Sequence, residues 1–348
     1  MPRSALKKIS KRRGKKKSRQ VRLGVLVLVI LIGIILTGKF IDFLGALFRP
    51  YSPETSLSAG KTGSWDGRNT LNLVIKSGDV YLFSFSPVNN SVTLFQIPPE
   101  TYIDVAFGFG NWPRRSVYGL GEGENPPMGA GLLKVAIANI LGVPVDGYLI
   151  IPDSPGRAAL PGLIQTMRNN PLSLFNLVRE SKTDLSLKEY WDFWWGIRRV
   201  RPDKLQTINL GNSGISSSKT LADGSRVLIL DRFGLDVLVQ KQIEDSRIKD
   251  QSLSVGIFNA TDHPGLAEKA SRIVTNMGGR VIFTVNFNQV LDYSVVTQRH
   301  QSYTASRLRE IFSSPARDQK PESFNLSPAT ADVNIILGED YFLRYNGP

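Results

Sequence analysis

Carboxylates and basic side chains are the groups of this sequence that could do chemistry, because thiols are absent and imidazoles are few. The 348 residues contain no cysteine, which excludes disulfides, cysteine-ligated zinc and a thiol nucleophile. Two histidines, His263 and His300, leave almost no material for a multi-histidine metal site or a Ser-His-Asp triad.

Three further motifs each have a structural explanation that competes with a functional one. Gly119, Gly121 and Gly123 form a Gly-rich loop without phosphate-loop spacing between a strand and a helix, so a nucleotide site has little support. His263 lies in Asp-His-Pro, where a role in helix entry is favoured over catalysis. The helix after Ser186 carries aromatic residues that could form a ligand platform, although aromatics at helical spacing usually belong to the core: Tyr190, Trp191, Phe193, Trp194 and Trp195.

Residues 70–243 are predicted to form the first folded domain, which must position these side chains. Ser186 and Glu189 form a capping box that opens the aromatic helix, and residues 211–218 are expected to be a Gly/Ser loop. Alternating or β-branched runs predict strands and periodic apolar residues predict helices. The strands are expected at 71–75, 80–85, 91–97, 145–151, 205–210 and 226–230, and the other helices at 131–141, 155–167, 171–180 and 233–243.

Residues 252–342 are predicted to form a second, small α/β domain behind a charged connector, 244–251. Helices are expected to begin at Pro264 and at Tyr303. The order strand, helix, strand implies parallel pairing with a right-handed crossover, and the whole chain is therefore predicted to be α/β (α+β). The strands of this domain are expected at 253–258, 280–285 and 332–337.

The N-terminus predicts a membrane anchor. Residues 1–22 contain eleven Lys and Arg and no acid, and an apolar segment follows directly. We predict a single transmembrane helix at 23–43 and a linker at 44–69, with the basic tail in the cytoplasm and the bulk of the chain outside. The alternatives are a cleaved signal peptide, a nucleic-acid or localisation patch, and a buried core helix, which the charge of the tail disfavours.

The charge distribution argues against nucleic acid as a partner. The formal net charge is +13, and removing the eleven charges of the tail leaves about +2 for the rest of the chain. An external region so close to neutral is not a nucleic-acid-binding domain on charge grounds. The partner predicted here is membrane lipid, contacted through the N-terminal helix.

The C-terminal residues resemble the LytR C-terminal domain of bacterial envelope proteins. An apolar strand ends in Asn259-Ala-Thr, a helix contains Gly265-Leu-Ala, Gly278-Gly279 leads into the next strand, and the closing strand ends in Leu337-Gly-Glu-Asp. The resemblance covers about 90 residues. In that family the domain usually follows an LCP (LytR-CpsA-Psr) domain behind a single N-terminal membrane helix.

The first domain is similar to the LCP domain in outline. Ile97-Pro-Pro-Glu-Thr-Tyr parallels the family's Ile-Pro-Arg-Asp-Thr-Tyr, and Leu141-Gly-Val-Pro-Val-Asp parallels its Leu-Gly-Val-Pro-Ile-Asp. Thr183-Asp-Leu-Ser resembles the closing Thr-Asn-Leu-Thr segment. The resemblance implies an LCP-like mixed α/β sheet.

The departures from the LCP pattern imply that much of the LCP chemistry is lost. Active LCP enzymes transfer a glycopolymer from a polyprenyl-pyrophosphate lipid to peptidoglycan, and several Arg with an Asp-bound Mg²⁺ ion offset the charge of the departing phosphate. Pro99 stands where the family has Arg, and Lys76-Ser-Gly-Asp79 replaces Arg-Ser-Asp-Thr. The carboxylate is thereby displaced by one position, which on a strand points it to the opposite face. The resemblance leaves Glu100, at the place of the family's Asp, and the pair Arg114-Arg115 as candidates for contact with an anion or a metal ion; the alternative is a solvated hairpin and loop.

We therefore expect a degenerate LCP-like domain in a membrane-anchored cell-envelope protein that binds or scaffolds, with no cofactor assigned. Envelope glycopolymer, lipid-linked glycan and other envelope proteins are its candidate partners. The alternative is an active phosphotransferase that uses Mg²⁺ and has rebuilt its pyrophosphate site. That alternative requires five residues to converge on one pocket with an apolar mouth: Lys76, Asp79, Glu100, Arg114 and Arg115.

Overall fold

The structure, a computed structural model, describes residues 39, 45, 50–52, 65–153, 160–169, 177, 179–312 and 331–346. The predicted basic tail 1–22 lies outside the described residues, as does the predicted transmembrane helix 23–43 apart from Lys39. Within the described part of the chain, no helix combines the length and apolar character needed to cross a membrane. The chain divides into two compact units, Met1–Arg49 and Pro50–Pro348, and both folded domains lie in the second.

A seven-stranded mixed sheet forms the centre of the first domain, in the order β1-β8-β7-β2-β3-β4-β9. The meander β2–β3–β4 is antiparallel, whereas β7 and β9 lie parallel to β2 and β4 respectively, so the predicted α/β (α+β) class is confirmed. The strands are β1 (Pro50–Ser52), β2 (Leu71–Ser77), β3 (Asp79–Ser86), β4 (Ser91–Ile97), β7 (Gly147–Ile150), β8 (Lys182–Ser186) and β9 (Leu205–Asn209).

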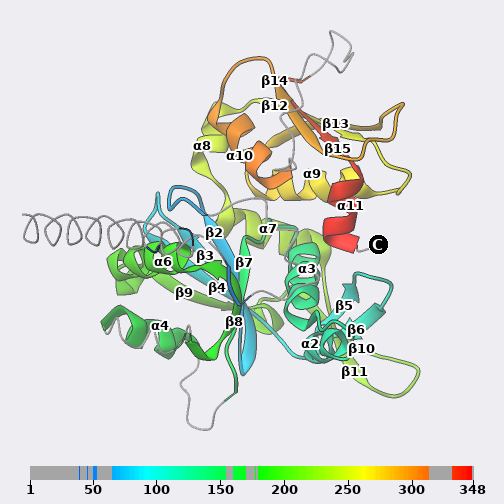
Figure 1. Cartoon of the computed structure of the whole chain (residues 1–348). Helices are drawn as coiled ribbons and strands as arrows, with labels where there is room; N and C mark the ends of the chain where they lie inside the picture. Colours follow the sequence, from blue (N-terminus) through cyan, green and yellow to red (C-terminus); the bar gives the residue numbers. More distant parts are fainter. Residues whose placement is uncertain are drawn as a thin grey trace, which may run out of the picture. The chain divides into compact units, whose positions relative to one another are not determined.

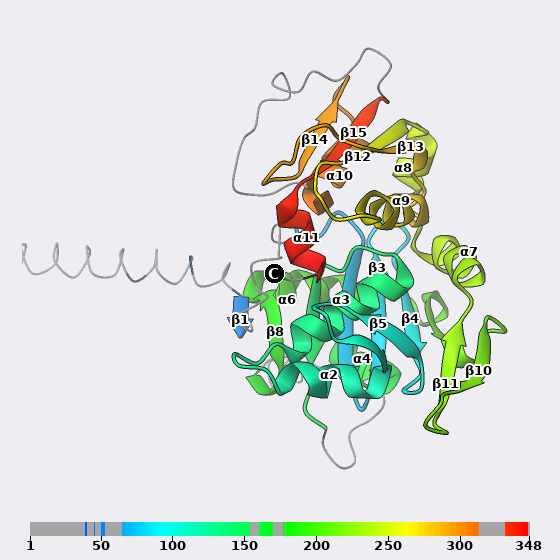
Figure 2. The ribbon, with the colours of Figure 1, turned by 90° about the vertical axis from the view of Figure 1, so that its right-hand side faces the viewer.

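Helices cover both faces of this sheet, so consecutive residues of its central strands, which point to opposite faces, are buried. Leu73 and Phe83 belong to a core cluster shared with α4 (Leu160–Asn169) and α6 (Leu187–Arg199). Val74 and Leu82 belong to a second cluster shared with three other helices. Figures 1 and 2 show these helices, which are α2 (Arg114–Glu122), α3 (Gly129–Leu141) and α7 (Arg232–Ile243).

The helix α2 is absent from the sequence prediction, which described Gly119 to Gly123 as a loop. Glycine has a low helix propensity, but here it permits a close helix crossing. A Cβ atom on Gly121 would lie 2.7 Å from the Cα of Gly129 on α3. Tight packing of α2 against α3 therefore outweighs the local propensity.

The capping box at the start of α6 is confirmed, and the helix divides its aromatic residues between core and surface. Ser186 Oγ accepts a hydrogen bond from the backbone N–H of Glu189, and Glu189 Oε2 accepts one from the N–H of Ser186. Phe193 and Trp194 are buried, whereas 60% of Trp191 and 46% of Trp195 are exposed. The predicted core role thus holds for Phe193 and Trp194 but not for Trp191 and Trp195.

Several other segments differ from the sequence prediction. The predicted Gly/Ser loop 211–218 ends in β10 (Ser216–Thr220), which pairs with β11 (Arg226–Leu230). The predicted connector contains the helix α8 (Ser246–Gln251). The predicted linker 44–69 includes β1 and the buried Trp65. Parts of the predicted helices 155–167 and 171–180 lie outside the described residues.

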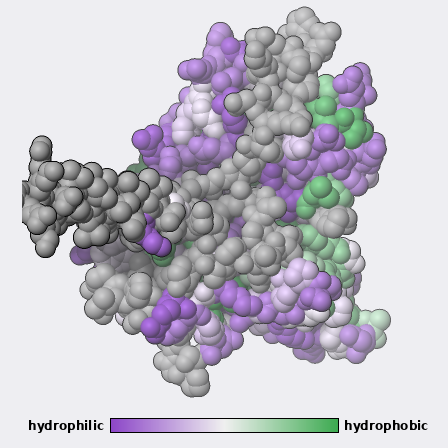
Figure 3. All heavy atoms as spheres, in the orientation of Figure 1, coloured by the Kyte–Doolittle hydropathy of each residue, from purple (hydrophilic) through white to green (hydrophobic). Residues whose placement is uncertain are grey.

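The C-terminal domain contains a four-stranded sheet in the order β13-β12-β15-β14. The parallel pairing of β12 with β13 and with β15 agrees with the predicted crossover. On the edge strand β13, Ile282 and Val285 are exposed, and Figure 3 shows hydrophobic residues at the surface of this domain. Its elements are β12 (Ser254–Asn259), α9 (Leu266–Asn276), β13 (Arg280–Asn286), β14 (Val295–Gln298), α10 (Tyr303–Phe312), β15 (Val333–Leu337) and α11 (Glu339–Asn346).

Candidate functional site

A two-stranded hairpin brings Glu100 and the Arg114–Arg115 pair together. The hairpin consists of β5 (Tyr102–Val105) and β6 (Gly110–Pro113), and it returns the chain to the turn that follows β4. The backbone N–H of Arg114 donates to the carbonyl of Thr101 at 2.7 Å, and that of Arg115 donates to the carbonyl of Pro99 at 3.0 Å. The start of α2 is thereby held against the Pro98–Thr101 turn.

Arg114 is the buried member of this group, with 6% of its side chain exposed. Its guanidinium lies 3.8 Å from the carboxylate of Asp79, which also accepts a 2.8 Å hydrogen bond from Gln96. Within the described part of the chain, Nε of Arg114 has no hydrogen-bond partner. A guanidinium carries five N–H donors, so this group is under-satisfied for its burial.

The electrostatics of this group follow from that burial. Burial lowers the pKa of Arg114, and the charges of Asp79 and Glu100 oppose the effect. Burial also raises the pKa of Tyr81, with a further contribution from the charge of Asp79. Because an arginine remains charged at neutral pH even so, the fold contains a buried cation with loosely placed counter-charges.

The two other candidate cations are also matched one-to-one with carboxylates. Arg115 lies 4.0 Å from Glu100, and both side chains are about half exposed. Lys76 contacts Asp153 at 3.1 Å, and its ammonium group lies 5.5 Å from the centre of the Tyr118 ring on α2. The cluster therefore has little surplus positive charge.

Four of the five predicted site residues thus come together: Asp79, Glu100, Arg114 and Arg115. Asp79 pairs with Arg114 and Glu100 pairs with Arg115, and the charges of both carboxylates oppose the lowering of the Arg114 pKa by burial. Lys76 has its own ionic partner. A magnesium ion prefers several oxygen ligands, but an arginine lies against each of the two carboxylates. Because an arginine engages each carboxylate, this donor set does not fit Mg²⁺. Across the described residues, no group of three or more His, Asp and Glu side chains could hold a metal ion.

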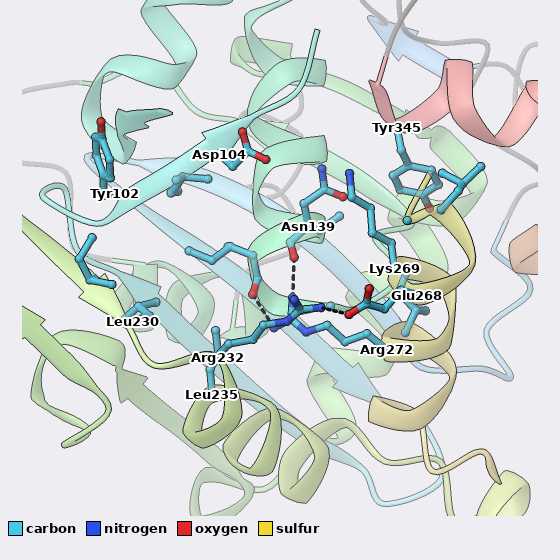
Figure 4. A pocket seen from close by; sticks show the side chains of 18 of the residues that line it. Tyr102, Asp104, Asn139, Leu230, Arg232, Leu235, Glu268, Lys269, Arg272 and Tyr345 are labelled. Atoms are coloured by element: carbon cyan, nitrogen blue, oxygen red, sulfur yellow. Dashed lines mark hydrogen bonds and ion pairs between the residues drawn. The ribbon is translucent and has the colours of Figure 1, made fainter. Parts of the chain in front are cut away.

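A cavity of about 390 Å³, missed by the sequence analysis, lies where the C-terminal domain contacts the first domain. Figure 4 shows side chains from α3, α7 and α9 around it, with Arg272 at its floor. Arg272 binds both carboxylate oxygens of Asp236, at 2.8 and 2.9 Å, and donates to the carbonyls of Asn139 and Ile140, at 2.7 and 2.8 Å.

The bonds of Arg272 cap a helix end. The last carbonyls of α3 have no partner within their own helix, and Arg272 together with Asn276 supplies donors from another domain. The only sequence signal for this contact is Gly142 after α3, where a Cβ atom would lie 2.8 Å from Nε of Arg272. None of the five predicted site residues lines this cavity.

The two sheets, with the bonds of Arg272 between them, define a two-domain α/β protein. The comparisons concern first its C-terminal part. Residues 252–341 match the family described as LytR cell envelope-related transcriptional attenuator. The resemblance inferred from the motifs of this region is confirmed. No match is found among the curated proteins.

Solved structures with partial similarity come from the LCP group. B. subtilis TagT is 13% identical, with 55% of this chain and 96% of that chain covered at a TM-score of 0.37. The regulator yvhJ from Bacillus subtilis is also 13% identical, with 49% and 94% covered at a TM-score of 0.39. YwtF (TagT) with bound octaprenyl pyrophosphate lipid is 13% identical, with 54% and 95% covered at 0.38. Similarity at this level assigns no activity to the present chain.

Proposed function

We propose that this protein is a membrane-anchored, extracytoplasmic component of the cell envelope that binds or scaffolds and does not transfer glycopolymer. In this proposal residues 1–22 lie in the cytoplasm, residues 23–43 span the membrane, and the folded domains lie outside. The match of residues 252–341 to an envelope-related family supports the cellular setting. The ligand class to test first is a lipid-linked glycopolymer.

The pairing of charges in the candidate site is the observation that carries the non-catalytic role. Lys76, Arg114 and Arg115 each face one carboxylate. Transfer from a pyrophosphate requires surplus positive charge to stabilise the leaving group, and charge already matched by carboxylates cannot supply it without rearrangement. Pro99, in the turn beside Glu100, has no side-chain donor at all.

A second candidate function, the active phosphotransferase, is favoured by one specific observation. Asp79, Glu100, Arg114 and Arg115 do come together, and Nε of Arg114 has no partner among the described residues. A free guanidinium donor beside two carboxylates could donate a hydrogen bond to a phosphate oxygen if the ion pairs opened. Activity and binding measurements on the same protein separate the two functions.

The decisive experiment is transfer of labelled, lipid-linked glycan to peptidoglycan by the full chain in vesicles with Mg²⁺. We expect retention of the lipid-linked glycan on the protein without turnover. Robust turnover that is lost in Glu100→Ala, but kept in the matched surface variant Glu124→Ala, would overturn the non-catalytic role. Glu124 is exposed and lies outside the cluster, so it controls for removal of a carboxylate.

The proposed topology has a separate test. A reporter that is active only outside the cytoplasm, fused to each terminus in turn, is expected to be active at the C-terminus alone. An active reporter at the N-terminus would reverse the orientation and remove the extracytoplasmic role.

A further inference from the structure

The exposed face of α6 combines tryptophan with arginine. Trp191, Trp195 and Arg198 follow one another at helical spacing of four and three residues, so they share a face, and Arg199 adjoins it. Trp191 and Trp195 are 60% and 46% exposed, although the neighbouring Trp194 is 5% exposed and packs in the core. We call Trp191, Trp195, Arg198 and Arg199 the α6 face.

The two arginines of the α6 face stay close to the aromatic rings. The guanidinium of Arg198 lies 4.9 Å from the centre of the Trp194 ring, and that of Arg199 lies 5.3 Å from the Trp195 ring. Among the described residues, neither arginine has a carboxylate within ion-pairing distance, whereas the acid Asp192 of this helix is paired with Lys188. The α6 face thus has the unmatched positive charge that the candidate site lacks.

The start of α6 lies beside the point where the chain enters the fold. Pro50 of β1 is the register partner of Ser186, the N-cap residue of α6, and Figure 2 shows β1 next to β8. Six residues, 44–49, separate Pro50 from the end of the predicted span. Six extended residues reach at most about 20 Å. A chain anchored at residue 43 therefore keeps α6 near the lipid surface.

We infer that the α6 face docks on the outer surface of the bilayer that holds the N-terminal anchor, with Trp191 and Trp195 at the interface and Arg198 and Arg199 against anionic lipid headgroups. Tryptophan prefers the interface because its ring is apolar and its N–H remains hydrated. Basic side chains are attracted to anionic lipid. The inference rests on the proposed anchoring, and it would fix the orientation of the first domain relative to the membrane.

The test uses the full chain reconstituted in vesicles of phosphatidylcholine and phosphatidylglycerol with brominated acyl chains, which quench tryptophan fluorescence on contact. We expect quenching severalfold stronger in the wild type than in the double variant Trp191→Ser/Trp195→Ser. The matched control is Trp112→Ser, since Trp112 is 40% exposed on β6 and should keep the wild-type quenching.

Charge and folding are controlled by a second variant. Arg198→Gln/Arg199→Gln retains both tryptophans and is expected to lose most of the quenching in vesicles with phosphatidylglycerol, with no change in pure phosphatidylcholine. If the tryptophan double variant fails to fold, this arginine variant still tests whether the α6 face docks on the bilayer.

The outcomes separate this inference from the proposed function. Flotation with the vesicles reports on the anchor, so a chain that fails to float overturns both the anchor and the docking. A chain that floats with equal quenching in wild type and double variant overturns the docking alone. A dimer in solution that is lost in the double variant, without lipid quenching, would assign the α6 face to a second copy instead.

Discussion

Two nearly buried arginines, Arg114 in the first domain and Arg272 in the C-terminal domain, differ in how fully their guanidinium groups are bonded. Their side chains are 6% and 12% exposed. Arg272 binds the carboxylate of Asp236 and two carbonyls at the end of α3, all at 2.7 to 2.9 Å. Arg114 has one ion pair at 3.8 Å and an Nε without a partner in the described residues.

This difference separates a structural arginine, Arg272, from a buried arginine whose donors are not all bonded, Arg114. A buried cation whose donors are all satisfied joins elements, and losing it leaves several partners unpaired. A buried cation with loose partners contributes little net stability, because its desolvation is not offset. Arg272 therefore holds two domains together, whereas Arg114 is a group that a ligand could still complete.

The largest expected effect comes from removing Arg272. Arg272→Met leaves the carbonyls of Asn139 and Ile140 without their donors and the Asp236 carboxylate with only the amide of Asn276, which is expected to lower the free energy of unfolding by about 3 kcal/mol. Urea unfolding of the full chain, followed by tryptophan fluorescence, measures it. The matched control is Arg232→Met at the same cavity, because Arg232 is exposed and lies 4.0 Å from Glu268.

The control is expected to change stability by less than about 0.5 kcal/mol. Equal losses of stability in the two variants would contradict the structural role of the Arg272 bonds. Hydrogen exchange at the C-terminal end of α3 provides a local readout, since those amides should exchange faster only in Arg272→Met.

A second, intermediate effect concerns Asp245, another buried charge with close partners. Burial raises the pKa of Asp245, but hydrogen bonds from Arg247 and Tyr303 and the charge of Arg247 together lower it below its ordinary 3.8. The native pKa is therefore below the unfolded one. The contribution of Asp245 to stability is full above pH 3.8 and is lost as the pH falls through the native value.

Unfolding measured across acid pH checks this effect. Asp245→Asn is expected to lower stability at neutral pH by about 1.5 kcal/mol and to flatten the loss below pH 4. Asp250→Asn on the same helix α8 is the matched control, because Asp250 is exposed. A wild-type acid profile in Asp245→Asn would show that other carboxylates are responsible.

The smallest expected effect comes from Arg114. Arg114→Met removes a loosely paired buried cation and replaces it with an apolar chain of similar length, so the free energy of unfolding should change by less than about 1 kcal/mol, in either direction. The measurement is the same urea unfolding. A loss as large as that of Arg272→Met would erase the distinction between the two arginines, and Arg115→Met serves as the exposed neighbour for comparison.

Patterns within a few residues predicted much of the fold. The apolar and β-branched runs of β2 to β4, the helical spacing in α9 and α10, and the capping box at Ser186 are each recognisable from residues close together in the sequence. The helix α2 was missed because its glycines have poor local propensity and are favoured by packing against α3. The candidate cluster was only partly predictable. Asp79 lies at the start of β3 and Arg114 follows the β5–β6 hairpin, so only the folded chain brings the two side chains together.

The sequence by itself determined the absence of cysteine chemistry, the basic N-terminus, the α/β pattern and the LytR C-terminal motifs, because composition and short periodicity do not depend on distant partners. Only the tertiary structure decided which charged and aromatic groups are satisfied. Arg272 meets the end of α3 from more than 130 residues away, and Trp191 is exposed while Trp194 is buried. The partners that bury or bond these side chains come from remote elements, and no local pattern encodes them.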